Sequence, residues 1–406
     1  MLLKFLSFKL NISILLIFLT LNLKANTKFL PKALDNTVIS LITCDPGDEI
    51  YSHFGHSALR IRNVNKEVDL IVNWGLFSFS ESQFQFGYDF AKGRLKYMMG
   101  FQRMDDFIYE YKISRRGVRE QILNLNNKLK NKLLEKINEN YRPENREYKY
   151  EFFYDNCSSR IRDIIITTLE SQLKLANSLD ANKYSFRDII HQYLKNDPWL
   201  ELGIDLVLGK RIDILVDNKN LMFLPKYLEE ILDKSLIKES TKIEDLVIKK
   251  NDIIPVENDQ KQSSKITIYS WIILIITLLF LILKNSRIFN IWSSLNLSLI
   301  GILGILLMFM WFGTDHQATK NNFNLLWASP LHLGLIYFII TNKWNIVSYW
   351  YIIFGLTLIF ITILFWFTLT QEFNNFVKPI ILHLSLIYYY YLRKNKNLIN
   401  LNSTKD

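Results

Sequence analysis

Hydrophobic residues gather at the two ends of the chain and leave a polar middle. An apolar run covers residues 12–23, and five apolar stretches of about bilayer-crossing length follow residue 265. Between them, residues 26–250 have the mixed composition of a soluble domain. The five stretches are residues 266–283, 293–312, 325–341, 346–368 and 376–392. The pattern predicts a membrane-attached protein with a soluble middle domain.

The first 25 residues have the order of a secretory signal peptide. Lys4 and Lys9 precede the apolar run, and Ala25 closes the segment. An uncleaved N-terminal anchor with the same orientation is the alternative. Either interpretation exports the chain from Asn26 onward, which in a bacterium means a periplasmic domain over residues 26–250.

Basic residues orient the apolar stretches. Lys284 follows the first stretch, Lys343 separates the third from the fourth, and Arg393 follows the fifth. Cytoplasmic loops carry an excess of lysine and arginine, so we expect these segments, and the tail 393–406, to be cytoplasmic. Residues 251–265 are polar and are predicted to be a linker. The expected location is the bacterial inner membrane, with several crossings.

The soluble domain begins with strand patterns and continues with helical ones. Apolar alternation and β-branched residues predict strands over residues 37–43, 57–63 and 68–74. Helical spacing predicts helices over residues 124–141, 157–171, 186–194 and 227–235. The predicted class is α+β, followed by an all-α bundle of about five transmembrane helices over residues 266–392.

Composition excludes two broad classes. Hydrophobic residues make up 49% of the 406 residues and charged residues only 22%, which excludes intrinsic disorder. The net charge of +10 raises the question of nucleic acid. Several of the cations lie beside apolar stretches, and the chain contains no nucleic-acid-binding motif, so we expect no such partner.

Cys157 is the candidate nucleophile. It follows Asp155 and Asn156, both good N-cap residues, and begins a helical pattern in which Ile161 and Ile165 share its face. The N-terminus of a helix favours a thiolate. A small core residue and a disulfide to Cys44 are the alternatives.

Two histidines precede the second predicted strand. His53 and His56 surround Gly55, and a histidine at the rim of a sheet can act as a general base. A metal site is the rival interpretation, but the chain has no metal-binding spacing, so we expect neither a metal nor a cofactor. For His53, a structural or substrate-orienting role is favoured over catalysis.

Polar residues on the strands complete the candidate site. Asn73 could orient the imidazole of His56, although an asparagine there can also be a turn residue. Arg60, Arg160 and Arg162 could bind phosphate groups of lipids, whereas simple solvation is the more common fate of such arginines. In chain order, the strand histidine comes first and the cysteine helix last, which reverses the order of ordinary papain-like enzymes.

The chain resembles the Lnb-type lipoprotein N-acyltransferases over most of residues 35–230 and in its polytopic C-terminal half. The resemblance rests on LITCDPGDEIYSHFGHSALRI, IVNWGLF, FAKGRLKYMMG, YRPENREYKYEFFYDNCSSRIRD, MFLP and GTDHQATKNNFNLLWASPLHL. It implies a circularly permuted papain-like (NlpC/P60-type) domain with Cys157 and His56 at its centre. The implied reaction moves an acyl chain from a phospholipid donor to the α-amine of a diacyl lipoprotein acceptor. A papain-like cell-wall amidase or peptidase and a non-enzymatic membrane scaffold are the competing interpretations.

The loop after the second C-terminal apolar stretch carries ionisable groups at the expected membrane boundary. Asp315 and His316 lie on the side assigned to the periplasm, which is also the side of Cys157. Ionisable groups near the membrane are costly unless they pair or serve a substrate. We expect residues 313–328 to help form the lipid entrance, although a plain interfacial loop is the alternative.

Overall fold

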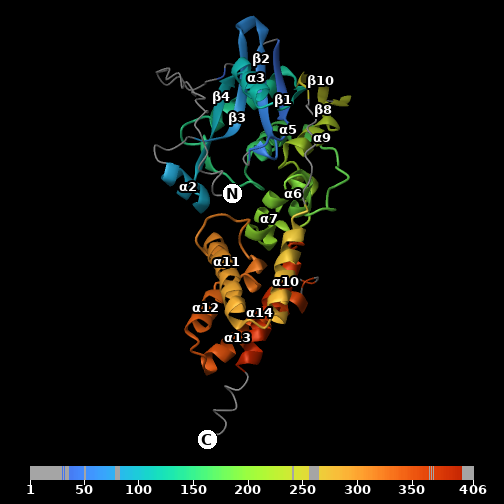
Figure 1. Cartoon of the computed structure of the whole chain (residues 1–406). Helices are drawn as coiled ribbons and strands as arrows, with labels where there is room; N and C mark the ends of the chain where they lie inside the picture. The colour runs from blue at the N-terminus through green and yellow to red at the C-terminus, as the bar shows by residue number, and fades with distance from the viewer. Residues whose placement is uncertain are drawn as a thin grey trace.

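The computed structural model shows a sheet-rich domain above a helical bundle (Figure 1). It describes residues 36–49, 52–77, 83–239, 242–255, 265–364 and 370–395, together with residues 30, 32, 366 and 368. We call residues 36–255 the sheet domain and residues 265–395 the helical bundle. The predicted signal segment and residues 396–406 of the predicted tail lie outside the described residues.

An antiparallel sheet forms the centre of the sheet domain, and its seven described strands have the order β10-β5-β1-β2-β3-β4-β6. The strands are β1 Thr37–Cys44, β2 His56–Asn63, β3 Val68–Phe77, β4 Lys96–Arg103, β5 Val118–Leu123, β6 Glu147–Lys149 and β10 Val247–Ile254. The three strands predicted from the sequence are confirmed as β1, β2 and β3. These central strands bury residues on both faces, which explains their nearly continuous apolar runs.

The helices of the sheet domain lie on both faces of this sheet and between it and the bundle (Figure 1). They are α2 Gln83–Lys92, α3 Met104–Ile113, α4 Asn127–Asn140, α5 Cys157–Leu169, α6 Phe186–Leu194, α7 Pro198–Val207, α8 Asn218–Leu221 and α9 Pro225–Asp233. A small second sheet pairs β7 Leu173–Lys174, β8 Leu236–Glu239 and β9 Lys242–Asp245. The four predicted helices are confirmed as α4, α5, α6 and α9; α6 has the predicted bounds, and the other three have shifted ends.

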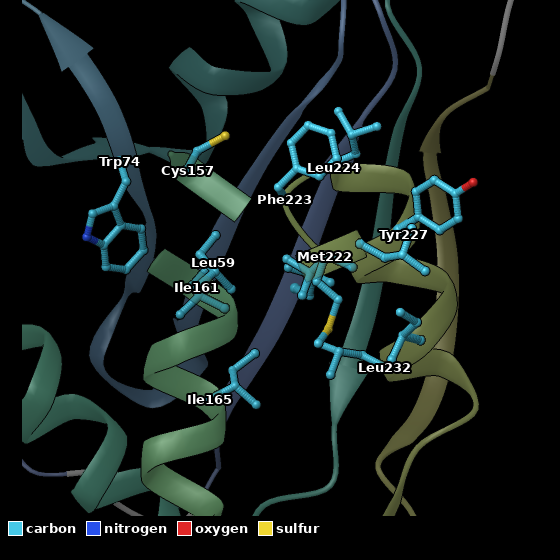
Figure 2. Close-up of a cluster of buried hydrophobic side chains, with 14 of the residues drawn as sticks. Leu59, Trp74, Cys157, Ile161, Ile165, Met222, Phe223, Leu224, Tyr227 and Leu232 are labelled. Atoms are coloured by element: carbon cyan, nitrogen blue, oxygen red, sulfur yellow. The ribbon is translucent and has the colours of Figure 1, made fainter. Parts of the chain in front are cut away.

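The main core lies between the sheet and the helices α4, α5 and α9. Ile161 and Ile165 of α5 pack towards Leu59 of β2, and Met222 and Phe223 close the cluster (Figure 2). The other face of the sheet packs against α3 through a smaller cluster of buried side chains. The sheet therefore lies between two cores, and α5 begins beside the start of the central strand β2.

The predicted linker begins too early. Residues 251–254 belong to β10, which pairs with β5 at the edge of the sheet. The sequence misled because β10 is an exposed edge strand, and its polar residues resemble those of a linker. Of the predicted linker, residues 256–264 lie outside the described part of the chain.

The described part of the helical bundle contains five helices: α10 Thr267–Ile282, α11 Ser286–Phe312, α12 His332–Thr341, α13 Ile346–Leu364 and α14 Val377–Lys394. By length and composition, α11 and α13 are long and apolar enough to cross a membrane, while α10 and α12 are shorter apolar helices. The stretch predicted over residues 325–341 is divided, since a 3-10 turn at Phe323–Leu326 precedes α12. The number of membrane crossings stays a prediction.

Candidate active site

Cys157 is the first residue of α5, and the local sequence fixes this start. The side chain of Asn156 accepts from the backbone N–H of Ser159, and the Ser159 hydroxyl accepts from the backbone N–H of Asn156. This capping box ends the preceding loop and begins the helix. Asn156 also donates to the carbonyl of Phe223, at 2.8 Å, which anchors the helix start to the core. Figure 2 shows the sulfur of Cys157 directed away from Ile161 and Ile165.

A tight turn at Gly55 places His56 near the start of α5. Gly55 has φ +81, and a Cβ at this position would lie 2.7 Å from the carbonyl oxygen of Cys44, so the turn requires glycine. His56 then begins β2 opposite Cys44 of β1. The hydroxyls of Ser57 and Ser158 lie 2.9 Å apart, which joins the start of β2 to the start of α5.

His56 and Cys157 lie close enough for each to change the pKa of the other. Burial by itself raises the pKa of Cys157, but the charge of His56 and hydrogen bonds from His56, the Ser57 backbone N–H and Ser158 outweigh it, so the pKa falls to about 7. Desolvation lowers the pKa of His56, yet the charge of Cys157 and bonds to Cys157 and Asn73 raise it overall. The structure thus favours a thiolate beside an imidazolium.

Asn73 orients the histidine. His56 Nε2 lies 3.1 Å from Asn73 Oδ1, an acceptor, so Nε2–H donates and Nδ1 is left for Cys157. Asn73 Nδ2 donates to Gln102 Oε1 at 3.1 Å, which holds the amide in this orientation. Gln102 in turn donates to Glu110 of α3 at 3.4 Å. The structure brings together the three predicted catalytic residues and adds Gln102, Ser57 and Ser158, which the sequence analysis missed.

Cys44 has a different environment. Both cysteines are free, so the disulfide alternative is wrong. Cys44 is buried among Ile42, Met104 and Phe107 on the α3 side of the sheet. Burial raises its pKa to about 12. The Cys44 thiol is therefore protonated and unreactive at neutral pH, although Cys44 lies opposite His56 in the register of β1 and β2.

Arg60 already has acidic partners, and its predicted phosphate-binding role stays a prediction. Its guanidinium donates to both oxygens of Asp69, at 2.7 and 2.6 Å, and to Glu120 at 3.0 Å. These bonds occupy the guanidinium on the α3 side of the sheet, several residues along β2 from His56. Arg160 pairs in the same way with Asp155, and Arg162 pairs with Asp163. Neither of these two arginines is free for a lipid phosphate.

His53 lies in the turn before β2, with its ring 5.9 Å from that of Phe54. Its Nδ1 is buried and makes no hydrogen bond. Such an atom is a costly feature in a folded protein, which agrees with a substrate-orienting role. That role stays a prediction.

Asp315 and His316 join the helical bundle to the sheet domain. Asp315 Oδ2 pairs with Lys149 at 3.1 Å and with Arg94 at 3.4 Å. His316 Nε2 donates to the carbonyl of Phe90, at 3.1 Å. The loop therefore lies beneath the sheet domain, as expected, whereas its predicted role at a lipid entrance stays a prediction.

A second polar cluster lies where α6 and α7 meet the bundle. His191, Glu201 and Asp205 have ligand atoms within 4.8 Å of one another, which would suit a metal ion. However, the Asp205 carboxylate already accepts from Arg187 at 2.8 Å, from His191 at 2.9 Å and from Asn374 at 2.9 Å. Arg187 is fully buried. The fixed positive charge in the cluster disfavours a cation, so the cluster is better described as a domain junction.

Comparison with known protein families explains the division of the chain. Residues 31–196 match the Lnb N-terminal periplasmic domain, and residues 261–397 match the Lnb transmembrane domain. The chain belongs to the Lnb family. It is a membrane protein with a periplasmic region, and the family assigns it to lipoprotein biogenesis. No curated protein and no solved structure matches the chain.

The Lnb assignment also places the candidate residues. Cys157, His56 and Asn73 all lie within the matched periplasmic domain. Asp315 and His316 lie within the matched transmembrane domain. In this Lnb protein the candidate centre is thus built by one domain, and the second domain contacts that domain from below, at Lys149 (Figure 1).

Proposed function

We propose that this Lnb protein is a lipoprotein N-acyltransferase that works through a thioester on Cys157. The observation that carries the proposal is the meeting of Cys157 with His56, whose imidazole is hydrogen-bonded to Asn73 and whose charge lowers the pKa of the thiol. It leaves a buried thiol with a pKa of about 7 at the start of a helix. A thiolate at neutral pH with an oriented base is the arrangement that acyl transfer needs.

In the first half-reaction, the Cys157 thiolate attacks an ester carbonyl of a phospholipid. The carbon–sulfur bond forms, and the negative charge moves to the carbonyl oxygen. Backbone N–H groups at the start of α5 are suitable donors for that oxygen. As the ester C–O bond breaks, the His56 imidazolium gives its proton to the departing alkoxide, and a lysophospholipid leaves.

In the second half-reaction, the α-amine of the lipidated N-terminal cysteine attacks the thioester. Neutral His56 accepts the proton of the amine, the amide bond forms, and Cys157 returns to the thiolate. An amine does not readily displace an alkoxide from an ester, so the thioester makes the overall transfer feasible. Asn73 keeps His56 Nδ1 directed at the sulfur in both steps.

The membrane half supports this choice of substrates. Both the donor and the acceptor are lipids, so a catalytic domain must be held at the bilayer surface to meet them. We propose five crossings of the inner membrane with the sheet domain in the periplasm, in agreement with the basic residues that follow α10 and α14. The order of His56, Asn73 and Cys157 supports a permuted papain-like fold.

The direct test is mass spectrometry of the purified protein after exposure to phospholipid vesicles. An acyl thioester on Cys157 supports the proposal, and its absence contradicts it. Lipoprotein N-termini from a deletion strain give the second measurement. Loss of the amide-linked chain is expected, whereas intact N-acylation with altered cell-wall peptides would favour an amidase, and no chemical change would favour a scaffold.

A further inference from the structure

Helix α2 carries aromatic residues but does not contribute to the hydrophobic cores. None of its described residues belongs to the clusters of buried hydrophobic side chains in the sheet domain or in the bundle. Tyr88 is 45% exposed and Phe90 is 54% exposed. Two large aromatic side chains near the C-terminal end of one short helix are therefore exposed, on different sides of that helix.

The C-terminal end of α2 is fixed to the end of α11. Lys92 Nζ donates to the carbonyl of Gly313 at 2.6 Å. The backbone carbonyl of Lys92 accepts from the backbone N–H of Asp315 at 2.9 Å. The carbonyl of Phe90 accepts from His316, and the turn at Gly93 packs against the same histidine. These bonds hold the C-terminal end of α2 just beyond the end of α11, on the side of the sheet domain (Figure 1).

The neighbouring surface has the character of a membrane boundary. Lys92 Nζ lies 5.8 Å from the ring centroid of Tyr88 and 5.1 Å from that of Phe309, so it bridges α2 and the last turns of α11. Phe312 is 70% exposed at the end of that helix. On another helix of the bundle, Tyr269 at the start of α10 packs against Trp199 of α7. Aromatic residues and lysines of this kind gather where a bilayer meets water.

Positive charge lies beside the exposed aromatic residues. Arg94 and Lys149 share the single carboxylate of Asp315, so their charges are only partly neutralised. Both cations keep more than half of their side-chain surface exposed. Exposed cations next to apolar rings suit the phosphate groups of lipids.

We propose that α2 is an interfacial helix whose Tyr88 and Phe90 lie among the lipid headgroups beside α11. The occupant of this surface is the bilayer, because α2 continues the exposed apolar surface of a transmembrane helix. The helix connects β3, which carries Asn73, to β4, which carries Gln102. Its insertion therefore fixes the orientation of the sheet domain, and of Cys157, relative to the membrane.

The test measures the depth of position 90 in the full chain in phospholipid vesicles. Phe90→Cys is made in the Cys157→Ala background and labelled with a fluorophore that is quenched by brominated lipids. Cys44 stays unlabelled because it is buried. Tyr109→Cys, at an exposed position of α3 on the sheet, is the matched control.

We expect the probe at position 90 to lose most of its emission with lipids brominated near the headgroup, and less with lipids brominated near the bilayer centre. The emission of the probe at position 109 should be the same in brominated and unbrominated vesicles. Equal emission from position 90 in brominated and unbrominated vesicles would overturn the proposal. Because the measurement uses a variant without Cys157, its outcome is independent of the proposed acyl transfer.

Discussion

The candidate centre at Cys157 and the junction at Asp315 are both polar, and both lie near the end of a helix, but they differ in their exposure to water. Cys157 is 7% exposed, and its few neighbours change its pKa enough to set its charge at neutral pH. The Asp315 side chain is 36% exposed, and Lys149 and Arg94 merely lower the pKa of a carboxyl that is already ionised. In the buried site, a few polar interactions are strong enough to change the charge of the reactive group. In the exposed site, similar interactions are weakened by water and only help to hold the two domains together.

The largest expected effect comes from removing the buried nucleophile. Cys157→Ala should lower acyl transfer by at least about 10³-fold, since the thioester cannot form. The protein should remain folded, because the capping box of Asn156 and Ser159 is untouched. The measurement is acyl transfer to a diacyl lipopeptide in vesicles.

Cys44→Ser is the matched control for Cys157→Ala. Cys44 is equally buried but lies on the α3 side of the sheet, so most of the activity should remain. Normal transfer by Cys157→Ala, or a severe defect in Cys44→Ser alone, would contradict the assignment of the nucleophile.

His56→Ala should lower acyl transfer nearly as much as Cys157→Ala. It also tests whether the charge of His56 sets the pKa of the buried thiol. In the Cys44→Ser background, alkylation of Cys157 should rise with pH around a midpoint of about 7, because the thiolate is the reactive form. Without His56, burial is no longer opposed by a neighbouring cation, so the midpoint should move upward. An unchanged midpoint would show that His56 does not set the charge of the thiol.

Asn73→Ala should cost less than either catalytic change, about 10²-fold in turnover, because Asn73 only orients the base. Gln102→Ala should cost about tenfold or less, since it holds the amide of Asn73 and not the imidazole. In both variants the midpoint of Cys157 alkylation is the discriminating measurement. A loss of turnover with an unchanged melting temperature indicates orientation, whereas a large loss of stability would indicate a structural role.

The sequence was sufficient for residues whose roles depend on local signals. The N-cap residue Asn156 places Cys157 at a helix start, and Gly55 places His56 at a strand start. The pairing of His56 with Asn73 needed only two neighbouring strands in simple antiparallel order. These predictions depended on short stretches of chain, and the structure brings the residues together.

The sequence did not predict contacts between residues far apart in the chain. The register between β3 and β4 shifts after Asn73, so the contact with Gln102 cannot be counted from the sequence. Arg60 pairs with Glu120 of β5, two strands away in the sheet, and the sequence does not show this partner of the predicted phosphate-binding residue. For the same reason, the sequence places residues 251–254 of edge strand β10 in the linker, because only the pairing with β5 distinguishes them.

The smallest expected effect comes from the exposed junction. Asp315→Ala with His316→Ala removes two ion pairs with Lys149 and Arg94 and one hydrogen bond to Phe90. Each exposed pair contributes little, so turnover should fall only by roughly two- to fivefold. The Cys157 thioester should still form, because the buried hydrogen bonds of the centre are untouched. Asp105→Ala, which breaks a more exposed pair with Arg103 within the sheet domain, is the control and should leave turnover unchanged. Normal transfer by the double variant would leave the loop without a role in the reaction, and loss of the thioester would show that the junction acts on the buried centre itself.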